Sequence, residues 1–302
     1  MQVVDSLPWR PEALLRLLAG VLTCVLLGAW VGLLWRAWPQ ARSWVLWAMA
    51  LPGTAALLCA LWVSRQPIRW ETLRRWVMAF GLSFYTGLIL LSLAHQWVGI
   101  AERRPGLPQL VLAGLSFQGA ALVLVTLFLR EHGTGWRETF GLRVRPWRSM
   151  GFGLVAGCAI LPVAWGLQLF TMAILQRLHV EAEVQVAVQV LQSTPDWRRQ
   201  LAMAVVAVVL APLAEEALFR GLLFRALQGL GYRRLAWWGT ALLFALVHAN
   251  AASFAALIVL ALWLAWLYDR AGNLLAPITA HAVFNALNFV ALQLYQRIGA
   301  GV

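Results

Sequence analysis

Long apolar runs alternate with short polar segments along the whole chain. A bilayer core requires about 20 apolar residues per helix, and nine runs reach or approach that length. They lie at about residues 13–35, 43–63, 76–100, 109–129, 151–176, 201–224, 235–250, 253–268 and 277–296. The seventh and eighth are short and almost adjacent, so they predict either two spans or one re-entrant hairpin. The pattern predicts an all-α, polytopic transmembrane helix bundle of eight to nine helices.

The composition is typical of an integral membrane protein. Hydrophobic residues make up 62% of the sequence and charged residues only 12%, whereas a soluble domain is about a quarter charged. The formal charge of +12 comes entirely from arginine, with no lysine present. In a soluble protein this excess would suggest a nucleic-acid partner. Here the arginines lie between apolar runs, where they meet anionic head groups, so we expect the lipid bilayer as partner and no nucleic acid.

The distribution of arginine predicts the orientation. Residues 64–75 and 130–150 are rich in arginine and fall on the same side of the membrane, together with Arg225, Arg233 and Arg234. The positive-inside rule makes that side cytoplasmic, together with the N-terminus. We expect a multi-pass protein of the cell membrane, and of the inner membrane if the source is bacterial. Residues 1–150 would form four spans with a cytoplasmic amphipathic loop, and residues 151–302 the remaining bundle.

Two adjacent carboxylates interrupt the sixth apolar run, in the segment A-P-L-A-E-E-A-L-F-R-G. A charged side chain at the bilayer centre costs about 2.5–3.5 kcal/mol on insertion scales. Arg220 follows Glu216 by four residues and lies on the same helical face, so these two side chains are expected to pair. Glu215 points about 100° away around the helix and has no such partner. It is therefore the natural candidate for a general base.

Two later runs carry histidine on a single polar stripe. In F-A-L-V-H, His248 follows Phe244 by four residues, and in H-A-V-F-N, Asn285 follows His281 by four residues. Such stripes can build a site in a bundle core. His281 is expected to lie at about the same depth in the membrane as Glu215, whereas His248 is expected to lie deeper.

Each of these features also has a structural interpretation. A Glu–Arg pair can join helices, and a single buried histidine or asparagine often only packs or bonds a neighbouring helix. The combination in three late runs is what favours function. H-E-x-x-H is absent, and no second intramembrane aspartate or matched serine machinery is present. What remains is a carboxylate and a histidine that can activate water, with a histidine and an asparagine that can stabilise an oxyanion, as peptide hydrolysis requires.

The three motifs resemble those of a known family. E-E-A-L-F-R, F-A-L-V-H and H-A-V-F-N are similar, in order and spacing, to the signature of the CAAX protease and bacteriocin-processing (CPBP) family, whose members are type II CAAX prenyl endopeptidase-like intramembrane proteases. The resemblance covers about residues 150–296. It implies that residues 151–302 form the catalytic transmembrane core.

The resemblance also implies a role for each motif residue. Glu215 and His248 would hold and activate the attacking water, Glu216 would pair with Arg220 and order the site, and His281 and Asn285 would stabilise the oxyanion. No cofactor is required in the glutamate-type mechanism that we favour. The alternative is a metal-dependent mechanism, in which Glu215, His248 and His281 would bind a divalent metal such as zinc.

The sequence therefore predicts an integral membrane endopeptidase whose site opens to the cytoplasmic side. Its expected substrate is a hydrophobic peptide or a membrane protein. Two other classes stay open at this point. A proton-coupled membrane transporter could use intramembrane Glu and His residues as a relay, and a non-catalytic membrane scaffold or immunity protein could retain the same fold.

Overall fold

The computed structural model describes residues 9, 11–37, 114–180 and 196–299, with isolated positions at 54, 58 and 62. These residues form helices and turns, and none of them lies in a β-strand. Two compact units divide the chain, one within residues 9–124 and a larger one within residues 125–302. The expected spans at 43–63 and 76–100 lie largely outside the described residues.

The smaller unit contains α1 (Pro11–Ala37), which packs against the π-helix η2 (Leu115–Gly119). The first helix agrees with the expected run at 13–35. Helix α5 (Ala120–Glu131) continues directly from η2, so these two elements occupy the expected run at 109–129.

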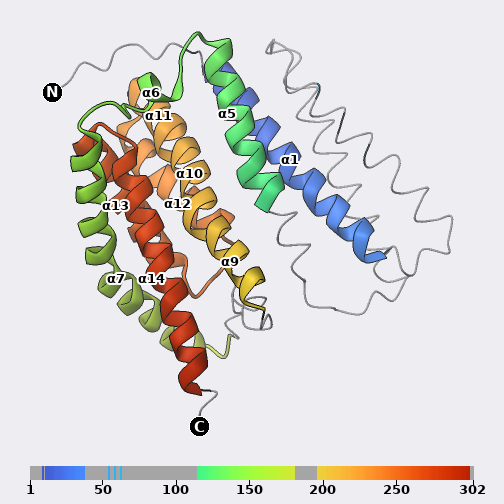
Figure 1. Cartoon of the computed structure of the whole chain (residues 1–302), viewed down its shortest axis with the longest axis vertical. Helices are drawn as coiled ribbons and strands as arrows, with labels where there is room; N and C mark the ends of the chain where they lie inside the picture. Colours follow the sequence, from blue (N-terminus) through green and yellow to red (C-terminus); the bar gives the residue numbers. More distant parts are fainter. Residues whose placement is uncertain are drawn as a thin grey trace. The chain divides into compact units, whose positions relative to one another are not determined.

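The larger unit holds every motif residue and is built from helices (Figure 1). It begins within α5, at Val125, and continues with α6 (Trp136–Thr139) and α7 (Pro146–Arg177). One continuous helix follows, made of α9 (Trp197–Val205), η3 (Val206–Leu210), α10 (Ala211–Glu216), η4 (Ala217–Phe224) and α11 (Arg225–Gly229). The last elements are η5 (Leu235–Gly239), α12 (Thr240–Val247), α13 (Phe254–Ala271) and α14 (Leu275–Gly299).

Four helical stretches among the described residues are long and apolar enough to cross a membrane. They are Pro146–Arg177, Gln200–Gly229, Phe254–Ala271 and Leu275–Leu294. The stretch Leu235–Val247 is apolar but shorter, about 20 Å at 1.5 Å per residue, which is less than the bilayer core. This stretch, formed by η5 and α12, therefore reaches only part of the way across before α13 returns. The protein is a membrane protein whose described residues are helical apart from turns, and the total of eight to nine helices remains a prediction.

The end of the larger unit at which α7 begins, α11 ends and α13 turns into α14 is the arginine-rich end. Its arginines are Arg143, Arg145, Arg148, Arg225, Arg233, Arg234 and Arg270. The segment after α6 docks here, since Phe140 is fully buried and its backbone oxygen accepts a hydrogen bond from Leu274 N at 3.0 Å. Asn273 donates from Nδ2 to the Val144 oxygen at 2.7 Å. The expected amphipathic loop at 136–143 is thus helical only over Trp136–Thr139, and Phe140 is inserted into protein.

Close packing of α7 on α14 sets the position of the last helix. Gly153 and Gly157 lie one turn apart on α7 and face the backbone of α14. A Cβ atom on Gly157 would lie 2.6 Å from the Ala280 oxygen, which is closer than atoms can approach. Small residues spaced four apart permit such contact between membrane helices. The position of His281, directly after Ala280, therefore depends on this glycine.

Candidate active site

The helix from Trp197 to Gly229 carries the two carboxylates within a short α-helical segment between π-helical turns. Glu215 and Glu216 end α10, which lies between η3 and η4. π-Helical turns are rare and are frequent at functional sites. Because a π turn adds a residue, it alters which side chains of the following turn face the neighbouring helices. These turns thus set the direction in which the carboxylates point.

Glu216 is fully buried and is held by two partners. Its Oε1 atom accepts hydrogen bonds from Arg220 Nη1 at 2.8 Å and from His281 Nδ1 at 2.9 Å. The i,i+4 pair expected from the spacing is therefore present. The contact with His281 comes from α14, which is far away in the sequence. Glu216 thus connects the carboxylate helix to the last helix of the bundle.

Arg220 is almost completely buried and makes several compensating contacts. Its Nη2 donates to the backbone oxygen of Ala261 on α13 at 3.0 Å. Its guanidinium carbon lies 4.6 Å from the centre of the Phe244 ring, in the geometry of a cation–π contact. Arg220 Nε has no hydrogen-bond partner among the described residues. The guanidinium therefore joins α13 and α12 to the helix that bears the carboxylates.

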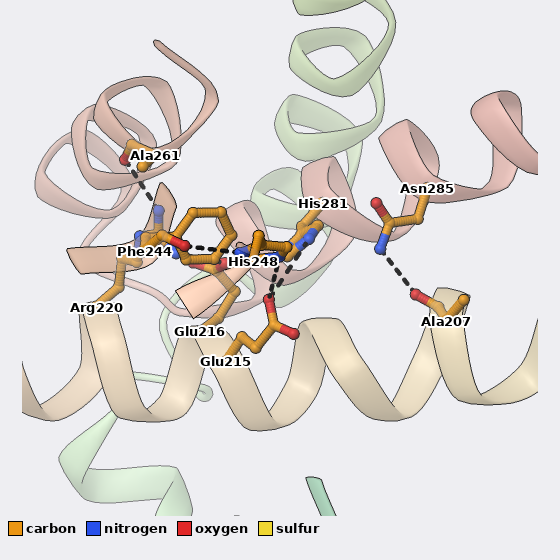
Figure 2. A network of polar contacts seen from close by, with 9 residues as sticks. All are labelled: Ala207, Glu215, Glu216, Arg220, Phe244, His248, Ala261, His281 and Asn285. Atoms are coloured by element: carbon orange, nitrogen blue, oxygen red, sulfur yellow. Dashed lines mark hydrogen bonds and ion pairs between the residues drawn. The ribbon is translucent and has the colours of Figure 1, made fainter. Parts of the chain in front are cut away.

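Glu215 points into a gap between two imidazole rings, as Figure 2 shows. Its Oε2 atom lies 4.0 Å from His248 Nε2 and 3.9 Å from His281 Nε2. The same oxygen is buried and has no hydrogen-bond partner among the described residues. These separations are too long for direct hydrogen bonds and are in the range that a bridging water spans. Three motifs distant in the sequence thus converge on one oxygen atom.

Both rings are fixed through their other nitrogen. His248 Nδ1 lies 2.6 Å from the Phe244 backbone oxygen, and His281 Nδ1 lies 2.9 Å from Glu216 Oε1. A carbonyl oxygen only accepts, so His248 Nδ1 carries the proton of that hydrogen bond. In a neutral ring the lone pair is then on Nε2, which faces Glu215. The fixed tautomer gives His248 the orientation of a proton acceptor at the site.

Asn285 lies one helical turn beyond His281 on α14 and is already engaged. Its Nδ2 donates to the backbone oxygen of Ala207, in the π-helical turn η3, at 2.8 Å (Figure 2). The amide has two N–H groups, so one remains for another acceptor. The Ala207 contact could not be predicted from the sequence, because the hydrophobic pattern does not reveal where the π-helical turn falls.

The site fits a metal ion poorly. Tetrahedral zinc at about 2.0–2.1 Å from each ligand brings the donor atoms to about 3.4 Å from one another. The Glu215–His248 and Glu215–His281 distances of 4.0 and 3.9 Å exceed that value. Among the described ranges, no group of three His, Cys, Asp or Glu side chains could hold a metal ion. We therefore derive no step through a metal.

Comparison with known proteins agrees with the motifs. Residues 197–287 match the family model described as type II CAAX prenyl endopeptidase Rce1-like. This confirms the resemblance to that family of membrane proteases over slightly less than a third of the chain, the part that carries Glu215, His248 and Asn285. Neither the curated proteins nor the solved structures gave a significant match.

Proposed function

We propose that this protein is an integral membrane endopeptidase that hydrolyses a peptide bond with water activated by Glu215 and His248. The observation that carries the proposal is the convergence of two oriented imidazole Nε2 atoms, 3.9 and 4.0 Å away, on the unpartnered Glu215 Oε2. Glu216 Oε2 is also buried without a partner among the described residues, but only Glu215 Oε2 faces both imidazole Nε2 atoms. A carboxylate placed beside an oriented base is the arrangement that water activation requires.

The proposed reaction begins with the water between Glu215 and His248. As the water oxygen bonds to the scissile carbonyl carbon, its proton passes to Glu215 or to the free Nε2 lone pair of His248. The carbonyl oxygen becomes an oxyanion, stabilised by the second amide N–H of Asn285 and by Nε2–H of His281 when that ring carries a proton on both nitrogens. The C–N bond then breaks, and the stored proton moves to the departing amine. The products are a new carboxyl terminus and a new amino terminus.

Glu216 and Arg220 have a positioning role in this proposal. Glu216 fixes the His281 ring through Nδ1, and Arg220 holds Glu216 in place through the 2.8 Å contact between Nη1 and Oε1. Neither side chain needs to touch the substrate. The mechanism is of the glutamate type and needs no cofactor, and the substrate is a hydrophobic peptide or a membrane protein.

The test compares protein termini in membranes from cells carrying the wild type or Glu215→Gln at equal expression. Because Glu215 Oε2 makes no hydrogen bond within the described part of the chain, the amide should fit without unfolding the site. The control is Glu138→Gln, on an exposed carboxylate whose nearest cation, Arg143, is 3.8 Å away. Termini that vanish only with Glu215→Gln support the proposal and identify the substrate. Identical termini in folded wild type and Glu215→Gln would overturn it.

The transporter and scaffold alternatives are not favoured. The matched family is one of endopeptidases, and the described spans place all the motif residues in one cluster rather than along a path across the bilayer.

A further inference from the structure

The segment between α5 and α7 contains no motif residue, yet it contacts the helices that carry the motifs. Its residues 136–145, which we call the Phe140 segment, consist of α6 and the turns that follow it. Within this segment Phe140 alone is fully buried. This side chain therefore marks the point at which the segment is attached to the bundle.

The ring of Phe140 lies directly on the carboxylate helix at Gly221. Gly221 follows Arg220 in η4 and is itself buried. A Cβ atom on Gly221 would lie 2.5 Å from Cε1 and 2.8 Å from Cδ1 of Phe140, which is closer than atoms can approach. The Trp136 ring packs against the Phe140 ring edge-to-face, with centres 5.0 Å apart. The Phe140 ring thus fills the space that any side chain larger than hydrogen would need at position 221.

The backbone of Phe140 binds the other helix of the Glu216–His281 pair. Leu274 N, immediately before α14, donates to Phe140 O at 3.0 Å, and Leu274 is fully buried. Gly221 is five residues after Glu216. His281 is seven residues after Leu274, so both contacts of Phe140 lie within about two helical turns of the pair. One residue therefore contacts both helices that the 2.9 Å hydrogen bond from His281 to Glu216 joins.

Polar contacts fix the backbone on both sides of Phe140. Arg225 Nη1 donates to the oxygen of Thr139, the preceding residue, at 2.9 Å. Further along the segment, Asn273 Nδ2 donates to Val144 O at 2.7 Å. The segment is thereby bound to α11 and to the turn before α14. The ring cannot leave Gly221 without breaking these hydrogen bonds.

We infer that Phe140 is a positioning residue of the candidate active site, because its ring and its backbone oxygen hold the carboxylate helix and α14 at the separation that brings Glu216 Oε1 to His281 Nδ1. This inference rests on the proposed endopeptidase function. The hydrogen bond to Glu216 fixes the His281 ring, whose Nε2 faces Glu215. Misplacement of a catalytic group by about 1 Å can cost about 10²-fold in rate. The shape of Phe140 therefore acts on kcat although its side chain does not touch the substrate.

Complementary substitutions at Phe140 and Gly221 test the inference. Phe140→Leu leaves a gap beside Gly221, and Gly221→Ala places a methyl group where the ring lies. In the double variant the methyl group fills the gap. At a temperature below the unfolding transition of every variant, we expect each single change to lower kcat about 10- to 100-fold with KM nearly unchanged. The double variant should recover most of that loss.

The matched control is Phe128→Leu. Phe128 is a phenylalanine of α5 that is 3% exposed and packs against the ring of His132. This change removes a similar amount of buried apolar surface at a position outside the Phe140 segment. We expect it to lower the unfolding temperature and to leave kcat unchanged.

A second measurement needs no substrate. The nitrogen NMR signals of the His281 ring, in histidine-labelled protein in detergent, report its hydrogen bond to Glu216, and their loss in His281→Asn assigns them. We expect Phe140→Leu and Gly221→Ala to shift these signals and the double variant to return them toward their wild-type positions. Phe128→Leu should leave them in place.

Three results would overturn the inference: unchanged His281 signals in the folded single variants, a fall in kcat that only follows the unfolding temperature, or a double variant no more active than the worse single one. Should Gly221→Ala not fold, the comparison of Phe140→Leu with Phe128→Leu decides. If Glu215→Gln leaves protein termini unchanged, the endopeptidase proposal fails, whereas the His281 signals still show whether Phe140 positions the cluster. The two ideas thus fail separately.

Discussion

Glu216 accepts a hydrogen bond from His281 Nδ1 across 2.9 Å, which joins α10 to α14 inside the bundle. The same oxygen accepts from Arg220, so one carboxylate balances a buried cation and orients an imidazole. Glu215, its neighbour in the sequence, balances nothing and faces the gap between two rings. Adjacent residues of the same type therefore have different consequences when they are changed.

Glu216→Gln should destabilise the protein strongly, whereas Glu215→Gln should not. Removing one partner of a buried ion pair leaves an uncompensated charge and costs about 3–5 kcal/mol. Thermal unfolding of purified protein in detergent, followed by tryptophan fluorescence, measures the difference. Adding Arg220→Met to Glu216→Gln removes the orphaned charge and should recover part of the loss. Equal melting temperatures for the two single variants would contradict this assignment.

His248→Asn should abolish most of the activity while keeping the fold. The asparagine amide can still donate to the Phe244 oxygen, as His248 Nδ1 does at 2.6 Å, but it offers no lone pair at the position of Nε2. General-base catalysis contributes about 10²–10⁴-fold, so we expect a loss of that size in kcat. The measurement is cleavage of the substrate identified by terminal analysis, with unfolding temperature as the control. Activity within a few-fold of wild type would exclude His248 as the base.

Gly157→Ala should disturb the site from a distance, and Gly151→Ala should not. A Cβ on Gly157 would lie 2.6 Å from the Ala280 oxygen, whereas nothing lies within 4 Å of a Cβ on Gly151. Both changes replace glycine by alanine in the same helix, so the gain in helix propensity is the same for each. We expect Gly157→Ala to push α14 away, lowering both the unfolding temperature and cleavage, because His281 follows Ala280. If the two variants have the same unfolding temperature and the same cleavage activity, α7 and α14 can move apart without disturbing the site.

The site's residues could be predicted from the sequence, but its geometry could not. Glu216 and Arg220 pair within one helix, and the i,i+4 spacing alone predicts that contact. The approach of His281 to Glu216 depends on how α14 packs on α7 and on the carboxylate helix, which spacing does not encode. His248 was expected to lie deeper than Glu215, with the run at 235–250 either a span or part of a re-entrant hairpin. This run is a shorter helix, and His248 Nε2 lies 4.0 Å from Glu215 Oε2.

The main features that the sequence did not predict come from backbone geometry. The π turns next to Glu216 leave no mark in the hydrophobic pattern, since inserting one residue shifts the periodicity only locally. The spacing of Gly153 and Gly157 on α7 was visible as G-x-x-x-G. Its meaning required the partner helix, because glycines so spaced occur also where helices do not touch.

Metal chelators should leave the activity unchanged. Within the described residues no group of three side chains could hold a metal ion, and the proposed water is oriented by Glu215 and His248 alone. Purified protein is incubated with EDTA or phenanthroline, then assayed against the same protein with added zinc. A zinc-dependent protease in the same buffer verifies that the chelator acts. Loss of cleavage with chelator and recovery on adding zinc would establish the metal form of this chemistry instead.

Asn285→Ala should slow cleavage far more than it destabilises the protein. The lost hydrogen bond to the Ala207 oxygen is worth about 1 kcal/mol of stability. Loss of an oxyanion donor costs about 10²–10³-fold in kcat.

Asn288→Ala is the matched control for Asn285→Ala. It removes the same side chain three residues further along α14, where Nδ2 donates to Phe284 O and Oδ1 accepts from Trp165. We expect Asn288→Ala to lose a similar amount of stability and to retain cleavage. If both variants lose activity only in proportion to stability, Asn285 merely ties α14 to the π turn η3. The oxyanion would then be stabilised by His281 alone.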